Sequence, residues 1–133
     1  MKKDYNSKYS VIIADDDAGC RETLKSILLE RGFETYEASS GSETIHIVRQ
    51  YHIDLGFLDY QMPDMTGLDI LKIIRNINPI LQCVIVTGVN EPTVADWARS
   101  LGALSLLHKP VRLDSIFETL DKMLNHLENL DIN

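Results

Sequence analysis

Four short, largely apolar runs in this chain each end at a polar or charged residue, and this pattern constrains the fold more than any other feature. The runs cover residues 11–14, 55–58, 83–86 and 104–108. The residues that follow them are Asp15, Asp59, Thr87 and Lys109. Continuous apolar runs of this length are typical of strands buried on both faces of a parallel sheet. Because the carboxyl ends of parallel strands lie on one edge, where ligands bind, we expect the four side chains to meet there.

The first run is followed by three consecutive carboxylates, at Asp15, Asp16 and Asp17. Carboxylates this close repel one another, so a cation is expected between them. Mg²⁺, which binds to one or two carboxylates and several waters, is the natural candidate. Taken alone, the triplet fits a solvated acidic loop that caps the next helix equally well. The polar ends of the later runs favour the cation site.

The four strand ends together offer a recognisable chemistry. Paired carboxylates suit a metal ion, Asp59 offers a nucleophile, Thr87 a hydroxyl donor and Lys109 a fixed positive charge. Phosphoryl transfer depends mostly on positioning and on neutralising charge, and this set supplies both. The residues alone therefore point to phosphoryl chemistry at the acidic edge of the sheet.

Four segments make the chain resemble the receiver domains of response regulators in two-component signalling. They are IIADDD, GFLDYQMPDMTGLDIL, VIVTG and LHKP, in this order and with spacing similar to that of the family. The resemblance covers roughly residues 9–127. It implies that Asp59 is the phosphorylated residue and that Mg²⁺ is the cofactor. The ligands it implies for Mg²⁺ are Asp15, Asp16, Asp59 and Gln61, the last through its backbone carbonyl.

The same resemblance assigns the remaining site residues. Thr87 is the hydroxyl that closes on the phosphoryl group, and Gly88 leaves room for that group. Lys109 is the motif lysine, aimed into the site by a cis bond to Pro110. One position departs from the family pattern, because Leu106 stands where receivers usually carry Phe or Tyr. We therefore expect Leu106 to stay packed against the fourth or fifth helix, with the switch led by Thr87 and the loop that follows it.

The alternation of strands and helices predicts a parallel α/β fold. The resemblance to receiver domains implies five strands in the flavodoxin-like order 2-1-3-4-5 with helices on both faces, giving three αβα layers. We expect an N-terminal tail at residues 1–8, the receiver domain at 9–128 and a C-terminal tail at 129–133. A strand is expected at 34–38, and helices at 18–31, after Ser40, at 67–76, after Glu91 and at 113–127. No output domain is expected within the 133 residues.

Helical spacing also predicts which side chains face inward. In the first helix these include Cys20, and Asp17 is expected to cap that helix. In the fourth, Trp97 falls on the apolar stripe, although it could also lie at a partner surface. In the last helix the stripe begins at Leu113 and continues for four turns.

Composition narrows the classes of function. A formal net charge of -7 disfavours general nucleic-acid binding, and no apolar stretch is long enough to span a membrane. Cys20 and Cys83 lack the spacing of a metal or redox motif, so we expect reduced thiols in a cytoplasmic protein. The chain is therefore read as a signalling module that catalyses only its own phosphorylation and dephosphorylation, not as an enzyme.

The expected phosphoryl donor is a phosphohistidine on a sensor histidine kinase or a histidine phosphotransfer protein. The expected effector surface combines the fourth helix, the fifth strand and the fifth helix. Two alternatives remain. A degenerate receiver could act as a scaffold that needs no phosphorylation, and an aspartate-based phosphohydrolase could use a similar site. The hydrolase would need a second aspartate where Gln61 stands.

Overall fold

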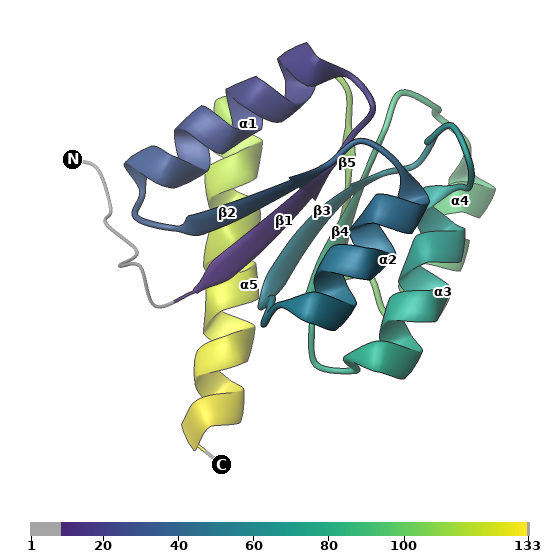
Figure 1. The fold of residues 1–133 in the computed structure, drawn as a ribbon. Coiled ribbons are helices and arrows are strands. Elements are labelled where there is room, and N and C mark those ends of the chain that lie inside the picture. The colour runs from purple at the N-terminus through teal and green to yellow at the C-terminus, as the bar shows by residue number, and fades with distance from the viewer. Residues whose placement is uncertain (1–8, 133) are drawn as a thin grey trace.

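In the computed structural model, which describes residues 9–132, a five-stranded parallel sheet lies between two layers of helices (Figure 1). The strands are β1 (Ser10–Ala14), β2 (Glu34–Ala38), β3 (Leu55–Asp59), β4 (Gln82–Thr87) and β5 (Ser105–His108). The helices are α1 (Ala18–Glu30), α2 (Gly41–Gln50), α3 (Gly67–Ile77), α4 (Pro92–Ser100) and α5 (Leu113–Ile132). The strand order is β2-β1-β3-β4-β5, which confirms the predicted fold.

The strands are buried because each face of the sheet has its own helical cover. Along β1, Ile12 and Ala14 point to a cluster with α2, α3 and α4, whereas Val11 and Ile13 point to a cluster with α1 and α5. This alternation follows from the two-residue period of a strand. Each fully buried aliphatic side chain contributes roughly 1.5–3 kcal/mol relative to an exposed one.

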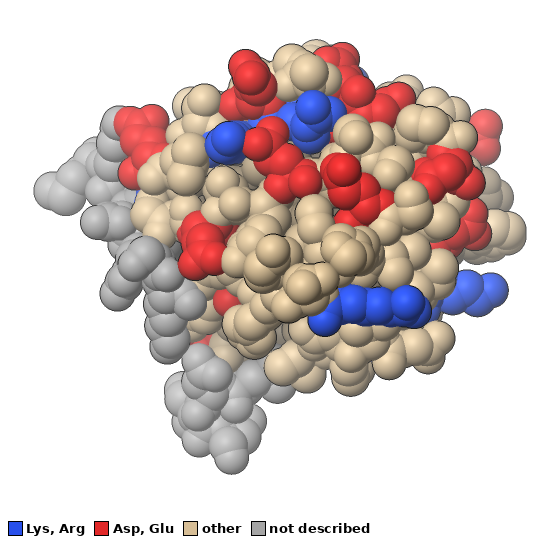
Figure 2. Space-filling model, viewed as in Figure 1, with Lys and Arg blue, Asp and Glu red and all other residues tan. Residues whose placement is uncertain are grey.

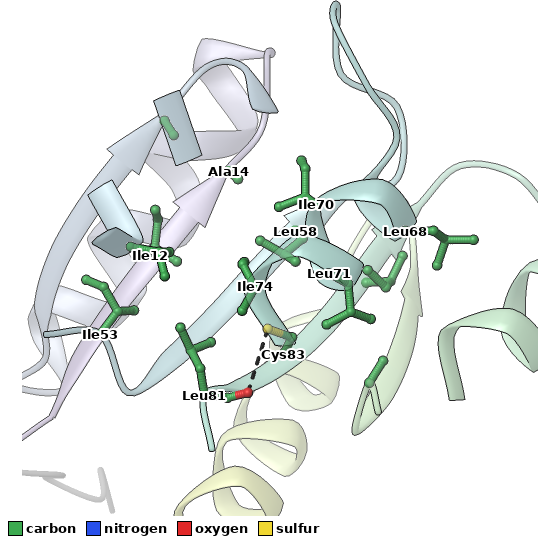
Figure 3. Packing of buried hydrophobic residues seen from close by; sticks show 14 of the residues in the cluster. Ile12, Ala14, Ile53, Leu58, Leu68, Ile70, Leu71, Ile74, Leu81 and Cys83 are labelled. Atoms are coloured by element: carbon green, nitrogen blue, oxygen red, sulfur yellow. Dashed lines mark hydrogen bonds between the residues drawn. The ribbon is translucent and has the colours of Figure 1, made fainter. Parts of the chain in front are cut away.

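The cluster under α3 is tightly packed, with side chains from β1, β3 and β4 meeting those of the helix (Figure 3). Gly56 in β3 fits a narrow space here, because a Cβ would lie 3.3 Å from Ile12 Cγ2 and 3.4 Å from Leu81 Cδ2, and these side chains would have to shift by a few tenths of an ångström. Cys83 is fully buried, and its burial raises the pKa of the thiol to about 12. Both residues therefore serve packing.

Side chains cap the first three helices. Asp17 accepts hydrogen bonds from the N–H groups of Gly19 and Cys20, as predicted. Ser40 accepts from Glu43 N in α2, and Thr66 forms a capping box at the start of α3. Within the described residues, α4 begins without a side-chain cap, at Glu91 and Pro92. Its start is therefore the least firmly fixed of these helix ends.

Two predictions of burial are wrong, those for Cys20 and Leu113, and of the two positions left open for Trp97 the structure has the exposed one. Cys20 is exposed, Trp97 is 66% exposed and Leu113 is 53% exposed. Cys20 and Leu113 lie in the first turns of α1 and α5, where those helices extend past the strand ends. In the short α4, Val94 and Ala98 are the buried residues, and Trp97 lies outside this buried face.

Apart from the end of the last helix, the ends of the helices and strands differ by about one residue from the predicted ones. The last helix continues to Ile132, past the expected domain end at 128. The expected tail at 1–8 lies outside the described residues. In the part of the chain from 9 to 132, no helix combines the length and apolar character needed to cross a bilayer.

Alanine at Gly67 should destabilise the protein by about 1–3 kcal/mol, because overpacking forces the backbone to shift. A Cβ there would lie 2.6 Å from the backbone carbonyl oxygen of Asp59. The matched control is Gly88→Ala, where a Cβ would meet no heavy atom of the described residues within 4 Å. That variant should be neutral or gain up to about 1 kcal/mol. Urea unfolding measures both, and equal losses would contradict the packing argument.

Candidate functional site

The carboxyl edge of the sheet brings together the side chains that the sequence analysis selected. Asp15 follows β1, Asp59 ends β3, Thr87 ends β4 and Lys109 follows β5. Because the strands are parallel and adjacent in register, with Asp59 opposite Val86 in β4, these ends lie side by side. The positions are therefore set by the backbone of the sheet.

Lys109 lies between two buried carboxylates. Its Nζ is 3.0 Å from Asp15 Oδ2 and 3.1 Å from Asp59 Oδ2. The side chains of Asp15 and Asp59 are only 9% and 5% exposed. Burial works against the charge on Lys109, but its bonds to the two carboxylates outweigh burial and raise its pKa. The ammonium group therefore stays charged and offsets part of the repulsion between the acids.

Burial raises the pKa of Asp59 to about 6, and the charge of Asp15 adds to this effect. The hydrogen bond from Lys109 acts in the opposite direction but does not cancel it. Even with the ammonium present, the pocket thus holds more negative charge than it can stabilise, which favours the binding of a cation.

A third carboxylate completes an acidic cluster. One oxygen each from Asp15, Asp16 and Asp59 lie within 4.8 Å of one another. Asp16 is exposed, so water can reach this side of the cluster. Several carboxylate oxygens and access to water are what Mg²⁺ requires. The donor set therefore fits the ion that the sequence predicted.

Backbone contacts fix the orientation of these acids. Asp15 Oδ1 accepts from Asp17 N at 2.9 Å, and Asp15 N donates to Ala38 O at 3.0 Å. Asp59 Oδ1 accepts from Gln61 N at 3.3 Å. Gln61 therefore lies next to the cluster, where the sequence analysis expected it.

Thr87 is fully buried, and its Oγ1 accepts from Val89 N at 2.9 Å. Its backbone oxygen accepts from Lys109 N at 2.8 Å, which links the ends of β4 and β5. Gly88 is exposed, with open space around its Cα among the described residues. The Lys109–Pro110 peptide bond is cis.

Leu106 lies away from the acids, on the other side of β5. It is partly buried against the cluster that includes Ala98 of α4 and Ala103. It also lines a hollow of about 340 Å³ between α4 and β5. Leu106 therefore faces α4 across this hollow.

The structure also has an open cleft that the sequence analysis missed. It has a volume of about 560 Å³ and is lined mainly by apolar side chains of the sheet, α1 and α5, with Asp15, Asp59 and Lys109 among its lining residues. Leu24 and Ile27 of α1 and Leu113 of α5 contribute to it. Helical spacing marks such residues as apolar but does not show that their helices leave a cleft between them.

Acidic side chains predominate over the upper part of the face in Figure 2, in keeping with the net charge of -7. One contact of an acidic side chain was also missed by the sequence analysis. Asp64, in the loop after β3, accepts from the backbone N–H groups of Gly41 and Ser42 at the start of α2. Nothing in the local sequence marks this contact, because its partners are more than twenty residues away.

Comparison with known proteins gives concordant results. Residues 11–121 match the family model of the response regulator receiver domain. The chain is 32% identical over 114 residues to Sporulation initiation phosphotransferase F of Bacillus subtilis, covering 86% of this chain and 92% of that protein. It is 32% identical over 121 residues to Transcriptional regulatory protein ZraR of Escherichia coli K12, covering 91% of this chain but only 27% of that longer protein.

A solved structure shows the same fold. The receiver domain protein from Methanospirillum hungatei JF-1 superimposes with a TM-score of 0.86, covering 91% of this chain and 98% of that one, at 24% identity.

Asp59→Asn should stabilise the protein at pH 8 in the presence of EDTA, by on the order of 1–2 kcal/mol after allowance for screening by water. The pKa of Asp59 in the folded protein is about 6, above its ordinary 3.8. The favourable contribution of Asp59 to folding is therefore complete only below about pH 4 and is lost as the pH rises through its folded pKa. Asparagine carries no such penalty.

Urea unfolding between pH 4 and pH 8 measures this difference. The advantage of the asparagine variant should grow across the range, approximately as a titration curve. If the wild type were the more stable protein at pH 8, the electrostatic account of the pocket would be wrong.

Proposed function

The chain belongs to the response regulator receiver family, and on this premise we propose that it is a cytoplasmic phosphoacceptor module of a two-component phosphorelay, with Asp59 as the phosphorylated residue. The observation that carries the proposal is the bridge from Lys109 Nζ to both Asp15 and Asp59 beside a third carboxylate. Support also comes from the Bacillus subtilis relative, which is named as a phosphotransferase.

Members of this family bind Mg²⁺ through an acidic pocket, and the donors here fit that ion. The residues that would hold it are Asp15, Asp16 and Asp59, with the backbone carbonyl of Gln61. When bound, Mg²⁺ would neutralise charge on the phosphoryl oxygens and on the carboxylates.

In the proposed transfer, a carboxylate oxygen of Asp59 attacks the phosphorus of a phosphohistidine in line with the P–N bond. A P–O bond forms as the P–N bond breaks, and the electron pair of that bond returns to the imidazole. The products are an acyl phosphate on Asp59 and a free histidine on the donor. Lys109 stays beside Asp59 and stabilises the negative charge of the transferred group.

We further propose that Thr87 passes the signal on. A hydroxyl can accept one hydrogen bond and donate another, so Thr87 can keep its bond from Val89 N while it donates to a phosphoryl oxygen. A shift of Thr87 would then draw the Val89 amide with it. The loop at 88–91 and the uncapped start of α4 would follow.

The proposed partners follow from this mechanism. The donor is a sensor histidine kinase or a histidine phosphotransfer protein. The effector binds to the face formed by α4, β5 and α5, because this face lies next to the loop that moves. The phosphorylated and unphosphorylated forms differ in their affinity for the effector, as any ligand-linked switch requires.

Phosphorylation should be confined to Asp59. Incubation with acetyl phosphate and Mg²⁺ should add one phosphoryl group, measured as intact mass, and Asp59→Asn should abolish the addition. Glu43→Gln, which removes an exposed carboxylate on α2, is the control and should be modified like the wild type. Unchanged modification of the asparagine variant would mean that another residue is the acceptor. A wild type that accepts no phosphoryl group would favour the scaffold alternative.

Leu106 should remain nearly still when the switch operates. It is an aliphatic side chain already partly buried against a cluster that includes Ala98 of α4, and exposing it would cost up to about 1.5–3 kcal/mol, the value for a fully buried side chain. Structures with and without beryllium fluoride, a phosphoryl mimic, should show movement of residues 88–91 with the Leu106 rotamer unchanged. A rotamer change at Leu106 together with an unmoved loop would refute this description.

A further inference from the structure

The Asp64 carboxylate joins two segments that are distant in sequence. Its Oδ1 accepts from Gly41 N at 2.7 Å and its Oδ2 from Ser42 N at 2.9 Å. These are the first two residues of α2, whose N–H groups have no partner within the helix. The bonds from Gly41 and then Ser42 lower the pKa of Asp64, so the group is a carboxylate at neutral pH. The loop after β3 thus caps the N-terminus of α2, a helix that precedes it in the sequence.

Packing reinforces this contact. A Cβ at position 41 would overlap the side chain of Met65, so the glycine allows the loop to approach α2 closely. Met65 is partly buried and packs against the cluster under α2 and α3. The loop and the start of α2 therefore meet through an apolar contact as well as through two hydrogen bonds.

The loop itself is short and internally bonded. Gln61 and Thr66 form an isolated bridge, Met62 N donates to Met65 O at 3.2 Å, and Gly67 N donates to Tyr60 O at 2.7 Å. A displacement at its tip is therefore transmitted to its base. The base includes Gln61, whose N–H reaches Asp59 Oδ1.

The start of α2 is also connected to the acidic cluster, through β2. Ser39 and Ser40 connect α2 directly to β2, and Ala38 O at the end of β2 accepts from Asp15 N at 3.0 Å. Asp15 and Asp59 are in turn joined by Lys109. Asp64 thus completes a closed ring of contacts around the cluster, from β1 through β2 and the start of α2 to the loop after β3.

We propose that Asp64 is a positioning residue for the cation and phosphoryl site: by tying the loop after β3 to the start of α2, it sets where Gln61 lies relative to Asp15 and Asp59. The inference rests on the proposed function and deepens it. Asp64 touches neither the reacting atoms nor the cation. It acts through the backbone of Gln61.

The test measures Mg²⁺ affinity by titration with MgCl₂, followed by amide chemical shifts. Asp64→Ala should raise the Kd for Mg²⁺ severalfold, up to about the tenfold that follows loss of a direct outer partner of a metal ligand. Phosphorylation by acetyl phosphate should slow at low Mg²⁺ and return to near the wild-type rate when Mg²⁺ is saturating. Asp64→Asn keeps one acceptor oxygen, so its Kd for Mg²⁺ should lie between those of the wild type and Asp64→Ala. It replaces the alanine variant if that variant does not fold.

Ser40→Ala is the matched control. It removes another cap of the same helix end, the bond from Glu43 N, but leaves Asp64 and its partners in place. Its Kd for Mg²⁺ should stay within twofold of the wild type. A wild-type Kd in Asp64→Ala, or an equal loss in Ser40→Ala, would overturn the inference, because the effect would then be absent or would reflect only the stability of α2.

A measurement without Mg²⁺ separates this inference from the proposed function. In EDTA, the amide shift of Gln61 should change in Asp64→Ala and stay unchanged in Ser40→Ala. If Gln61 does not respond, the inference fails even when the wild type binds Mg²⁺ and is phosphorylated. If Gln61 responds but the wild type neither binds Mg²⁺ nor accepts a phosphoryl group, the proposed function fails and the coupling through the loop stands.

Discussion

The acidic edge of this sheet depends on the ammonium group of Lys109. Asp15 and Asp59 are almost fully buried and close together, and like charges in such a setting are costly unless a counter-charge lies between them. The backbone N–H of Lys109 donates to Thr87 O, so the end of β4 fixes the base of the side chain. One ammonium group compensates only part of the charge of three carboxylates. The residual negative charge favours a cation in this pocket.

The site combines fixed and movable parts. Asp15, Asp59 and Lys109 are held by strand ends and by contacts with one another. The segment after Thr87 is held differently, through the hydroxyl of Thr87 and the amide of Val89, and it leads into a helix that starts without a side-chain cap. If the pocket is phosphorylated as proposed, the new group would act against a fixed frame and on a helix start that has no side-chain cap.

Much of the fold was predictable because its signals are local. Apolar runs identified β1, β3, β4 and β5, and the alternation of strands and helices placed β2, which is not an apolar run. Capping residues and helical periodicity identified the helices, and the polar strand ends selected the residues that the structure brings together. Burial at Cys20 and Leu113 was predicted wrongly, since periodicity defines a face of a helix but not how far the sheet extends beneath it. The contact of Asp64 with α2 had no local signal at all. It depends on where two loops meet in space, and the sequence of either loop is compatible with other arrangements.

The two thiols differ in a way that gives access to the dynamics of the core. Cys83 lies among fully buried side chains of β3, β4 and α3, and its high pKa leaves almost no thiolate in the folded protein (Figure 3). Cys20 is open to solvent. An alkylating reagent therefore reaches Cys20 at once but meets Cys83 only when the sheet opens. In a Cys20→Ser variant, the labelling rate of Cys83 therefore measures how often the core opens, and the measurement needs no added denaturant.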